Sequence, residues 1–145
     1  MDKTTNRILG VIVAVILLVA AIAVAVGSRP VAKIDPSKAE GVVQAYLTAV
    51  LERNFDEAAR YFAADSPCKA EFFTQTWIPE SAQVSLVNVS TSGSATTVTV
   101  TAEIPSGDPF GGSYQEQHSF RLTPSGETWA LVGSPWPLYD CGVMK

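Results

Sequence analysis

An apolar run near the N-terminus constrains this chain more than any other feature. Ile8 to Gly27 are twenty consecutive residues without a charge, a proline or a side-chain amide. A helix needs about 20 apolar residues to cross the hydrocarbon core of a bilayer, which is roughly 30 Å thick. The run therefore predicts a transmembrane helix over residues 8–27. A cleaved signal sequence is the alternative, because Ala23-Val24-Ala25 has the small-residue pattern of a cleavage site.

The charges around the run bear on its orientation. Two basic residues precede it and two follow it: Lys3, Arg7, Arg29 and Lys33. The bias that keeps basic loops in the cytoplasm is thus nearly balanced, and a long C-terminal part translocates largely regardless of charge. We expect a single-pass protein of the cell membrane. Residues 1–7 would be a cytoplasmic tail, residues 28–34 a linker and residues 35–145 an extracytoplasmic domain.

The part after the run is acidic. Without Lys3, Arg7 and Asp2, the totals of 10 basic and 14 acidic residues become 8 and 13. A protein that binds nucleic acid needs a basic surface for the phosphates. We therefore expect no nucleic-acid partner. About 118 residues remain after the run, which is enough for one small domain with a single core.

The chain has two cysteines, Cys68 and Cys141. In an extracytoplasmic domain, an even number of cysteines indicates a disulfide. Such a bridge would close a loop of more than 70 residues and hold a chain end that otherwise frays. The alternative is two separate buried thiols.

Helical signals occupy the first half of the domain. Asp35 and Pro36 predict a helix start, with Ser37 and Glu40 as an alternative capping box. Asn54 is a predicted stop because asparagine tolerates the left-handed conformation. One apolar stripe at helical spacing lies between them: Val42, Val43, Tyr46, Leu47, Val50 and Leu51. Gly41 interrupts this helix at a cost of about 1 kcal/mol relative to alanine.

Two shorter helices are expected before the chain changes character. The first covers residues 56–63, with Ala59, Phe62 and Ala63 on its inner face. The second begins at Ser66-Pro67, carries Cys68, Phe72 and Phe73, and ends before "WIPES".

From residue 83 the pattern has the period of β-strands. Residues 94–104 alternate strictly, with Val98, Val100, Ala102 and Ile104 on one face. Three further runs, residues 83–90, 114–123 and 128–136, are also bounded by turn residues. Helices followed by strands indicate an α+β domain, in which three helices cover one face of a four-stranded antiparallel sheet.

These elements resemble the nuclear transport factor 2-like superfamily, also called cystatin-like. The resemblance covers residues 36–138 and lies in the amphipathic helix, the turn Asn54 to Ala59, Tyr61-Phe62, and the final "TWALVGSPWP". It implies a cone-shaped domain whose curved sheet and first helix enclose a pocket. Some members are enzymes, such as ketosteroid isomerases and SnoaL-type cyclases, and many are binding or dimerisation modules. A membrane-anchored bacterial subset, which includes actinobacterial cell-envelope proteins, has the same layout as this chain.

The strand over residues 114–123 carries the candidate chemistry. If Phe120 and Leu122 face the core, the two-residue period places Tyr114, Glu116 and His118 on the same side. His118 is the only histidine of the chain. Glu116 could orient its imidazole, or the pair could exchange a proton with a ligand. The alternative is that both side chains lie at the solvated rim. The candidate ligand-binding residues are Tyr46, Tyr114, Glu116, His118 and Trp129.

Other chemistry is not indicated. One histidine and two distant cysteines do not make a usual zinc site, so we expect no metal and no cofactor. Trp77, Trp129 and Trp136 could form an aromatic patch on a partner surface, or they could simply fill the core.

Two functions are consistent with these observations. The first is a non-catalytic binding or interaction module of the bacterial cell envelope, anchored by its N-terminal helix. Its partner would be an envelope protein or a second copy of the chain. The alternative is a small isomerase or cyclase that uses Glu116 and His118. A closed pocket on which both side chains converge would favour the enzyme.

Overall fold

The computed structural model describes residues 32–107, 111–139 and 141. The predicted tail over residues 1–7 and the predicted transmembrane helix over residues 8–27 lie outside this part. Among the described residues, no helix has the length and apolar character needed to cross a membrane. The chain divides into two compact units, and the second, residues 34–145, is described here by itself.

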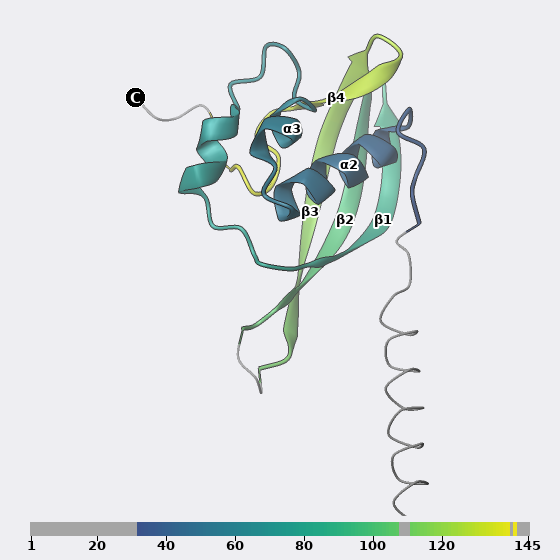
Figure 1. Cartoon of the computed structure of the whole chain (residues 1–145). Coiled ribbons are helices and arrows are strands. Elements are labelled where there is room, and N and C mark those ends of the chain that lie inside the picture. Colours follow the sequence, from purple (N-terminus) through teal and green to yellow (C-terminus); the bar gives the residue numbers. More distant parts are fainter. Residues whose placement is uncertain (1–31, 108–110, 140, 142–145) are drawn as a thin grey trace, which may run out of the picture. The chain divides into compact units, whose positions relative to one another are not determined.

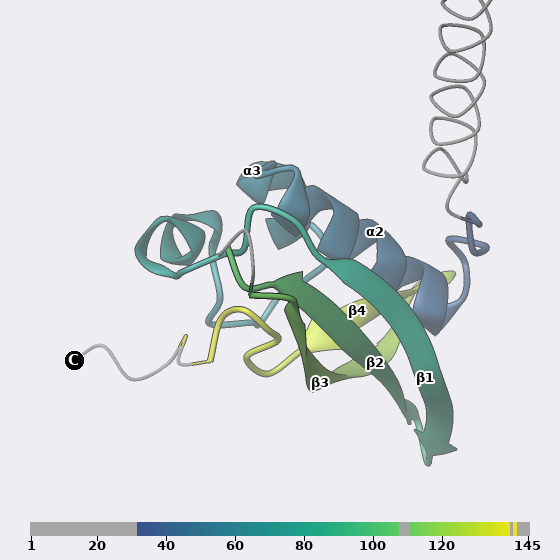
Figure 2. The same cartoon turned by 90° about the horizontal axis from the view of Figure 1, so that it is seen from below.

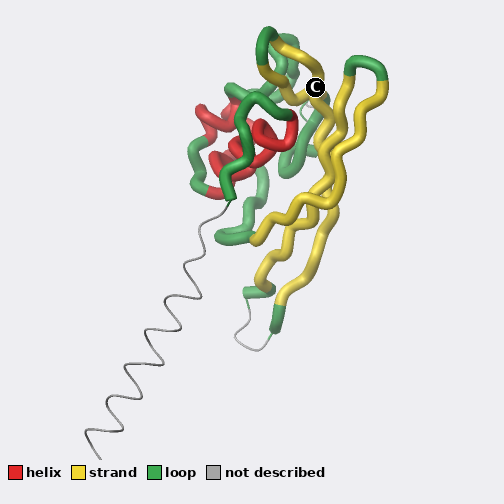
Figure 3. Tube along the Cα trace, turned by 90° about the vertical axis from the view of Figure 1, so that its right-hand side faces the viewer, coloured by secondary structure: helices red, strands yellow, loops and turns green. Residues whose placement is uncertain are grey.

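Three helical segments precede the sheet. They are the α-helices α2 (Ala39–Leu51) and α3 (Phe55–Ala59) and the 3₁₀-helix η1 (Ala70–Gln75). Helix α2 packs along the sheet and contacts β2 and β4 (Figure 1). Figures 2 and 3 show the helices gathered on one side of the strands.

Four strands form one antiparallel sheet in the order β1-β2-β3-β4. They are β1 (Gln83–Ser92), β2 (Ala95–Pro105), β3 (Ser113–Ser125) and β4 (Thr128–Val132). The predicted α+β class is therefore confirmed. The alternation predicted for β2 is also confirmed, because every second residue from Thr96 to Ile104 is buried.

The start of α2 was predicted wrongly. The helix begins at Ala39 rather than at Pro36, and the Asp35 carboxylate accepts bonds from the Ser37 backbone and hydroxyl at 2.9 and 2.7 Å. These bonds lower the pKa of Asp35 and hold a tight turn in place of the capping box. A Cβ on Gly41 would lie 2.0 Å from the Asp35 carbonyl oxygen. Gly41 is thus the residue that admits this turn against the helix.

The end of α2 also differs from the prediction. Arg53 has the left-handed conformation, with φ 59°, instead of Asn54. Asn54 caps the next helix, because its side chain accepts a hydrogen bond from the Glu57 backbone N–H at 3.3 Å. Asparagine suits both roles, so the sequence alone did not separate them.

The two following helices are shorter than predicted. Helix α3 ends at Ala59, and its buried residue is Ala58. The predicted continuation, Tyr61 to Ala63, bonds to β4 instead. Ser66 starts a turn in which its side chain accepts from the Cys68 N–H at 3.2 Å, and the helix begins only at Ala70.

The core lies between α2 and the inner face of the sheet. Tyr46 is fully buried at its centre and contacts Phe62, Phe73 and Phe120, with ring centroids 5.7, 6.4 and 6.0 Å away. Leu122 and Leu131 are also fully buried. Tyr46, which was predicted to line a ligand pocket, is therefore part of the packed aromatic core.

Candidate functional site

Glu116 and His118 lie together on the inner face of β3, as the strand period predicted. Their register partners on β2 are Ala102 and Val100, which are both buried. Glu116 Oε2 is 3.2 Å from His118 Nε2. The His118 side chain is 10% exposed and that of Glu116 is 43% exposed. The pair thus joins a nearly buried imidazole to a carboxylate that reaches solvent.

The imidazole of His118 has an incomplete set of polar contacts. Its Nε2 atom is buried and has no hydrogen-bond partner of good geometry, although the Glu116 carboxylate lies 3.2 Å away. The ring stacks on Trp136, with centroids 4.9 Å apart. Burial lowers the pKa of His118 by more than the neighbouring Glu116 raises it. The ring is therefore neutral near pH 7.

The C-terminal segment covers this part of the sheet. Tyr46 donates its hydroxyl proton to the Trp136 carbonyl at 2.9 Å, and burial raises the pKa of that phenol. Trp136 and Leu138 are both buried. The disulfide between Cys68 and Cys141 is confirmed, with the two Cα atoms 4.8 Å apart. Tyr46 and His118 therefore both contact Trp136, in a segment that the disulfide fixes to the helical layer.

The remaining candidate residues are more dispersed. Tyr114 shares the face of Glu116 and His118 but is 41% exposed. Tyr139, which was not among the predicted residues, is 64% exposed, and its pKa is raised by partial burial and by the charge of Glu116. Trp129 pairs with Pro124, six residues along β3 from His118, which corresponds to roughly 20 Å. The structure thus places Tyr46 and His118 against Trp136, with Glu116 beside His118, and leaves Trp129 outside this group.

A shallow, open hollow of about 320 Å³ lies elsewhere on the domain. Its lining comes from the α2–α3 turn and from η1: Arg53, Asn54, Phe55, Asp56, Ala70, Glu71 and Thr74. None of the predicted ligand-binding side chains lines it. Within the described ranges, no group of three or more His, Cys, Asp and Glu side chains could hold a metal ion.

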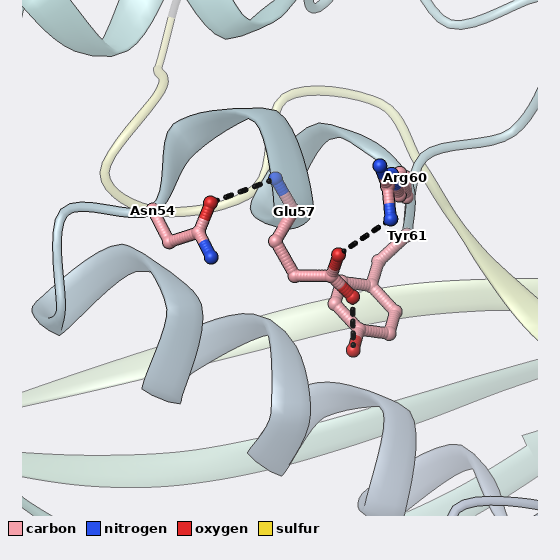
Figure 4. Close-up of polar contacts among 4 residues, drawn as sticks. All are labelled: Asn54, Glu57, Arg60 and Tyr61. Atoms are coloured by element: carbon pink, nitrogen blue, oxygen red, sulfur yellow. Dashed lines mark hydrogen bonds and ion pairs between the residues drawn. The ribbon is translucent and has the colours of Figure 1, made fainter.

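A polar cluster fixes α3 and the segment after it (Figure 4). The Glu57 carboxylate accepts from Arg60 Nη1 at 2.9 Å and from the Tyr61 hydroxyl at 3.3 Å. Asn54 accepts from the Glu57 backbone at 3.3 Å, so all four residues form one local network. This network orients Tyr61 at the point where the chain reaches β4.

One surface was not predicted from the sequence: the outer edge of β1, with which no described strand pairs. All ten residues of this strand are exposed. Its large apolar side chains are among the most exposed described in the domain: Val84 37%, Leu86 49%, Val87 52% and Val89 39%. The signal in the sequence is a strand of ten residues without one charge, which is unusual at an edge.

Comparison with known proteins gives a fold and no activity. No family model matches the chain, and no curated protein matches it. A solved structure of a SEC-C motif containing protein from Rhodopseudomonas palustris is similar, with a TM-score of 0.53 and 11% identity. The match covers 69% of this chain and 79% of that chain. At this identity the likeness concerns only the arrangement of the helices and the four-stranded sheet.

Proposed function

We propose that this chain is a non-catalytic binding module of the bacterial cell envelope. In this proposal residues 8–27 span the membrane. The domain over residues 35–145 is a nuclear transport factor 2-like cone on the outer side. In this proposal the domain binds an envelope partner through its outer surface rather than a small ligand in its interior.

The packing of the interior carries the proposal. Members of the superfamily that act on small molecules need a pocket inside the cone, and ligand pockets are typically about 300 Å³ or larger. Here Tyr46 occupies the middle of the interior and touches three phenylalanine rings. The hydroxyl of Tyr46 is already bonded to the Trp136 carbonyl. A ligand would have to displace this packed core.

The disulfide supports the location. Disulfides persist in oxidising compartments and are rare in the cytosol. The bridge between Cys68 and Cys141 closes a span of 73 residues, and both cysteines are buried. A bridge of this kind fits a domain that folds after export.

A second function, an isomerase or cyclase, has one observation in its favour. His118 Nε2 is buried without an aligned hydrogen bond, 3.2 Å from the Glu116 carboxylate. Perturbed histidines beside carboxylates are common at catalytic sites. This function would require Trp136 to move away from the imidazole, because the two rings are stacked.

Thiol labelling of whole cells tests the proposal. An impermeant reagent should label the chain only after reduction, since the described cysteines are all in the disulfide. The matched control is Cys68→Ser, in which Cys141 should be labelled without reduction once the chain end loosens. If neither the reduced wild type nor the Cys68→Ser variant is labelled in intact cells, but both are labelled after lysis, the extracytoplasmic location is contradicted.

A further inference from the structure

We propose that the β1 edge is the docking surface of the domain and that its partner is a second copy of this chain. The two β1 strands would pair antiparallel about a two-fold axis. The inference deepens the proposed function. It rests on that function in one respect, because the membrane anchor is what concentrates the two copies.

The two edges of the sheet differ in their hydrogen bonding. At the β4 edge, the Leu131 N–H donates to the Tyr61 carbonyl, and the Leu131 carbonyl accepts from the Ala63 N–H, both at 2.8 Å. Phe62 thereby forms a parallel bridge with Leu131. Strand β1 pairs with β2 on one side, and no described strand pairs with its other side. Its outer backbone groups are therefore available to another extended strand.

The side chains of β1 add an apolar component. Val84, Leu86 and Val89 stand opposite Ala102, Val100 and Val98 of β2, so they belong to the inner face of the sheet. The three β2 residues are at most 4% exposed, whereas those of β1 are 37–49% exposed. A neighbouring strand that continued the sheet would cover part of this row and bury apolar area.

A second copy is the occupant that we choose, because two identical uncharged edge strands can pair about a two-fold axis without bringing like charges into contact. The part of the chain after the apolar run is acidic, so two copies repel each other over most of their surfaces. Strand β1 has no charged residue and no proline, the two devices by which natural edges usually prevent pairing. A two-fold interface needs only one self-complementary patch, and a neutral strand meets this condition without like charges in contact.

The bulge in β1 sets the extent of the pairing. The register with β2 shifts between Leu86 and Asn88, with Val87 as the extra residue. A bulge disrupts the ladder and bends the strand. The pairing is therefore confined to one side of the bulge, either Gln83–Leu86 or Asn88–Ser92. The membrane anchor compensates for this short ladder, because tethering in one membrane raises the effective concentration of the two copies.

The mass of the full-length chain in detergent micelles, measured over a range of concentrations, tests the inference. Of Leu86→Lys and Val89→Lys, the variant on the paired side of the bulge should raise the dimer dissociation constant about tenfold or more, because it brings like charges together across the axis. Ser125→Lys, at the exposed end of β3, is the matched control and should leave the constant unchanged. A monomer at every concentration, or a dimer that neither β1 lysine weakens, would overturn the inference.

Cross-linking locates the contact independently of the lysine variants. Ser85→Cys and Ser90→Cys each introduce a free thiol on an exposed β1 position, one on either side of the bulge. At least one of them should form a covalent dimer on mild oxidation, whereas Ser125→Cys should not. Equal cross-linking at all three positions, or none at β1, would count against β1 pairing. Whole-cell thiol labelling reports export separately from dimerisation. A chain that is exported but monomeric would therefore contradict this inference and leave the proposed function intact.

Discussion

The two edge strands of the sheet, β4 and β1, differ in how their outer sides are covered. The β4 edge exchanges two backbone hydrogen bonds with the Tyr61–Ala63 segment, which α3 and its Asn54 cap hold in place. The β1 edge receives no strand from the described part of the chain, and its apolar side chains are exposed. Within the described residues, the helical layer thus protects one edge and no strand covers the other, which is what a docking surface requires.

The stabilising contacts follow the same asymmetry. The disulfide joins the segment before η1 to the C-terminal segment, beside the β3–β4 side of the sheet. Tyr46 and His118 both contact Trp136 of that C-terminal segment. Strand β1 is held chiefly by its ladder with β2. We therefore expect perturbations of the β4 side to change stability and perturbations of the β1 side to change association.

Removal of the disulfide should have the largest effect on stability. Replacement of both Cys68 and Cys141 by serine releases a cross-link that spans 73 residues, which corresponds to about 4 kcal/mol on the chain-entropy model. Urea unfolding of the variant and of the wild type, with and without a reductant, measures this loss. If the reduced and oxidised wild type unfold at the same urea concentration, the C-terminal segment is not held as we describe.

A pair of leucines compares the two edges directly. Leu131→Ala on β4 should cost about 2–5 kcal/mol of unfolding free energy, because the side chain is fully buried. Leu86→Ala on β1, where the side chain is 49% exposed, should change the unfolding free energy of the monomer by about 0.5 kcal/mol or less. Denaturation at low protein concentration checks both. If the two variants lose similar amounts of unfolding free energy, the two edges do not differ in the way that we describe.

The titration of His118 should have a smaller effect. Because burial lowers its pKa in the folded state, the unfolded chain takes up the proton at higher pH than the folded domain does. Stability should therefore fall as the pH drops through the unfolded value of about 6.5 and below. NMR of the single histidine should give a midpoint below 6.5.

The matched variant is Glu116→Gln, which removes the charge that partly offsets burial and should lower the midpoint further. A midpoint at or above 6.5 in the wild type would mean that Trp136 does not shield the ring.

Much of the fold could be predicted from local patterns. The strict alternation around Val98 and Val100 identified β2, and the same period placed Glu116 and His118 on the side of Phe120. The disulfide was predicted from the number of cysteines and from the extracytoplasmic location that the apolar run led us to expect. These features depend on residues close in sequence or on chemistry that a single residue type carries.

The rest depended on contacts between distant segments. Tyr61 to Ala63 leave the helical path because they bond to β4, about 70 residues later. Gly41 is unfavourable for α2 by helix propensity, but the Asp35 carbonyl packs so close to it that no side chain would fit. Strand β1 was predicted as a strand, but its place at an edge depends on which strands pair, and the sequence pattern does not specify that.

Hydrogen exchange resolved by residue, at low and high concentration of the full-length chain, tests the contrast between the edges most directly. The backbone N–H groups of Ala63 and Leu131 should be protected at both concentrations, because their bonds lie within one chain. The outward-facing N–H groups of β1 should exchange rapidly in dilute protein and become protected at high concentration. Unchanged exchange of the β1 groups over the whole range would contradict our account of this edge.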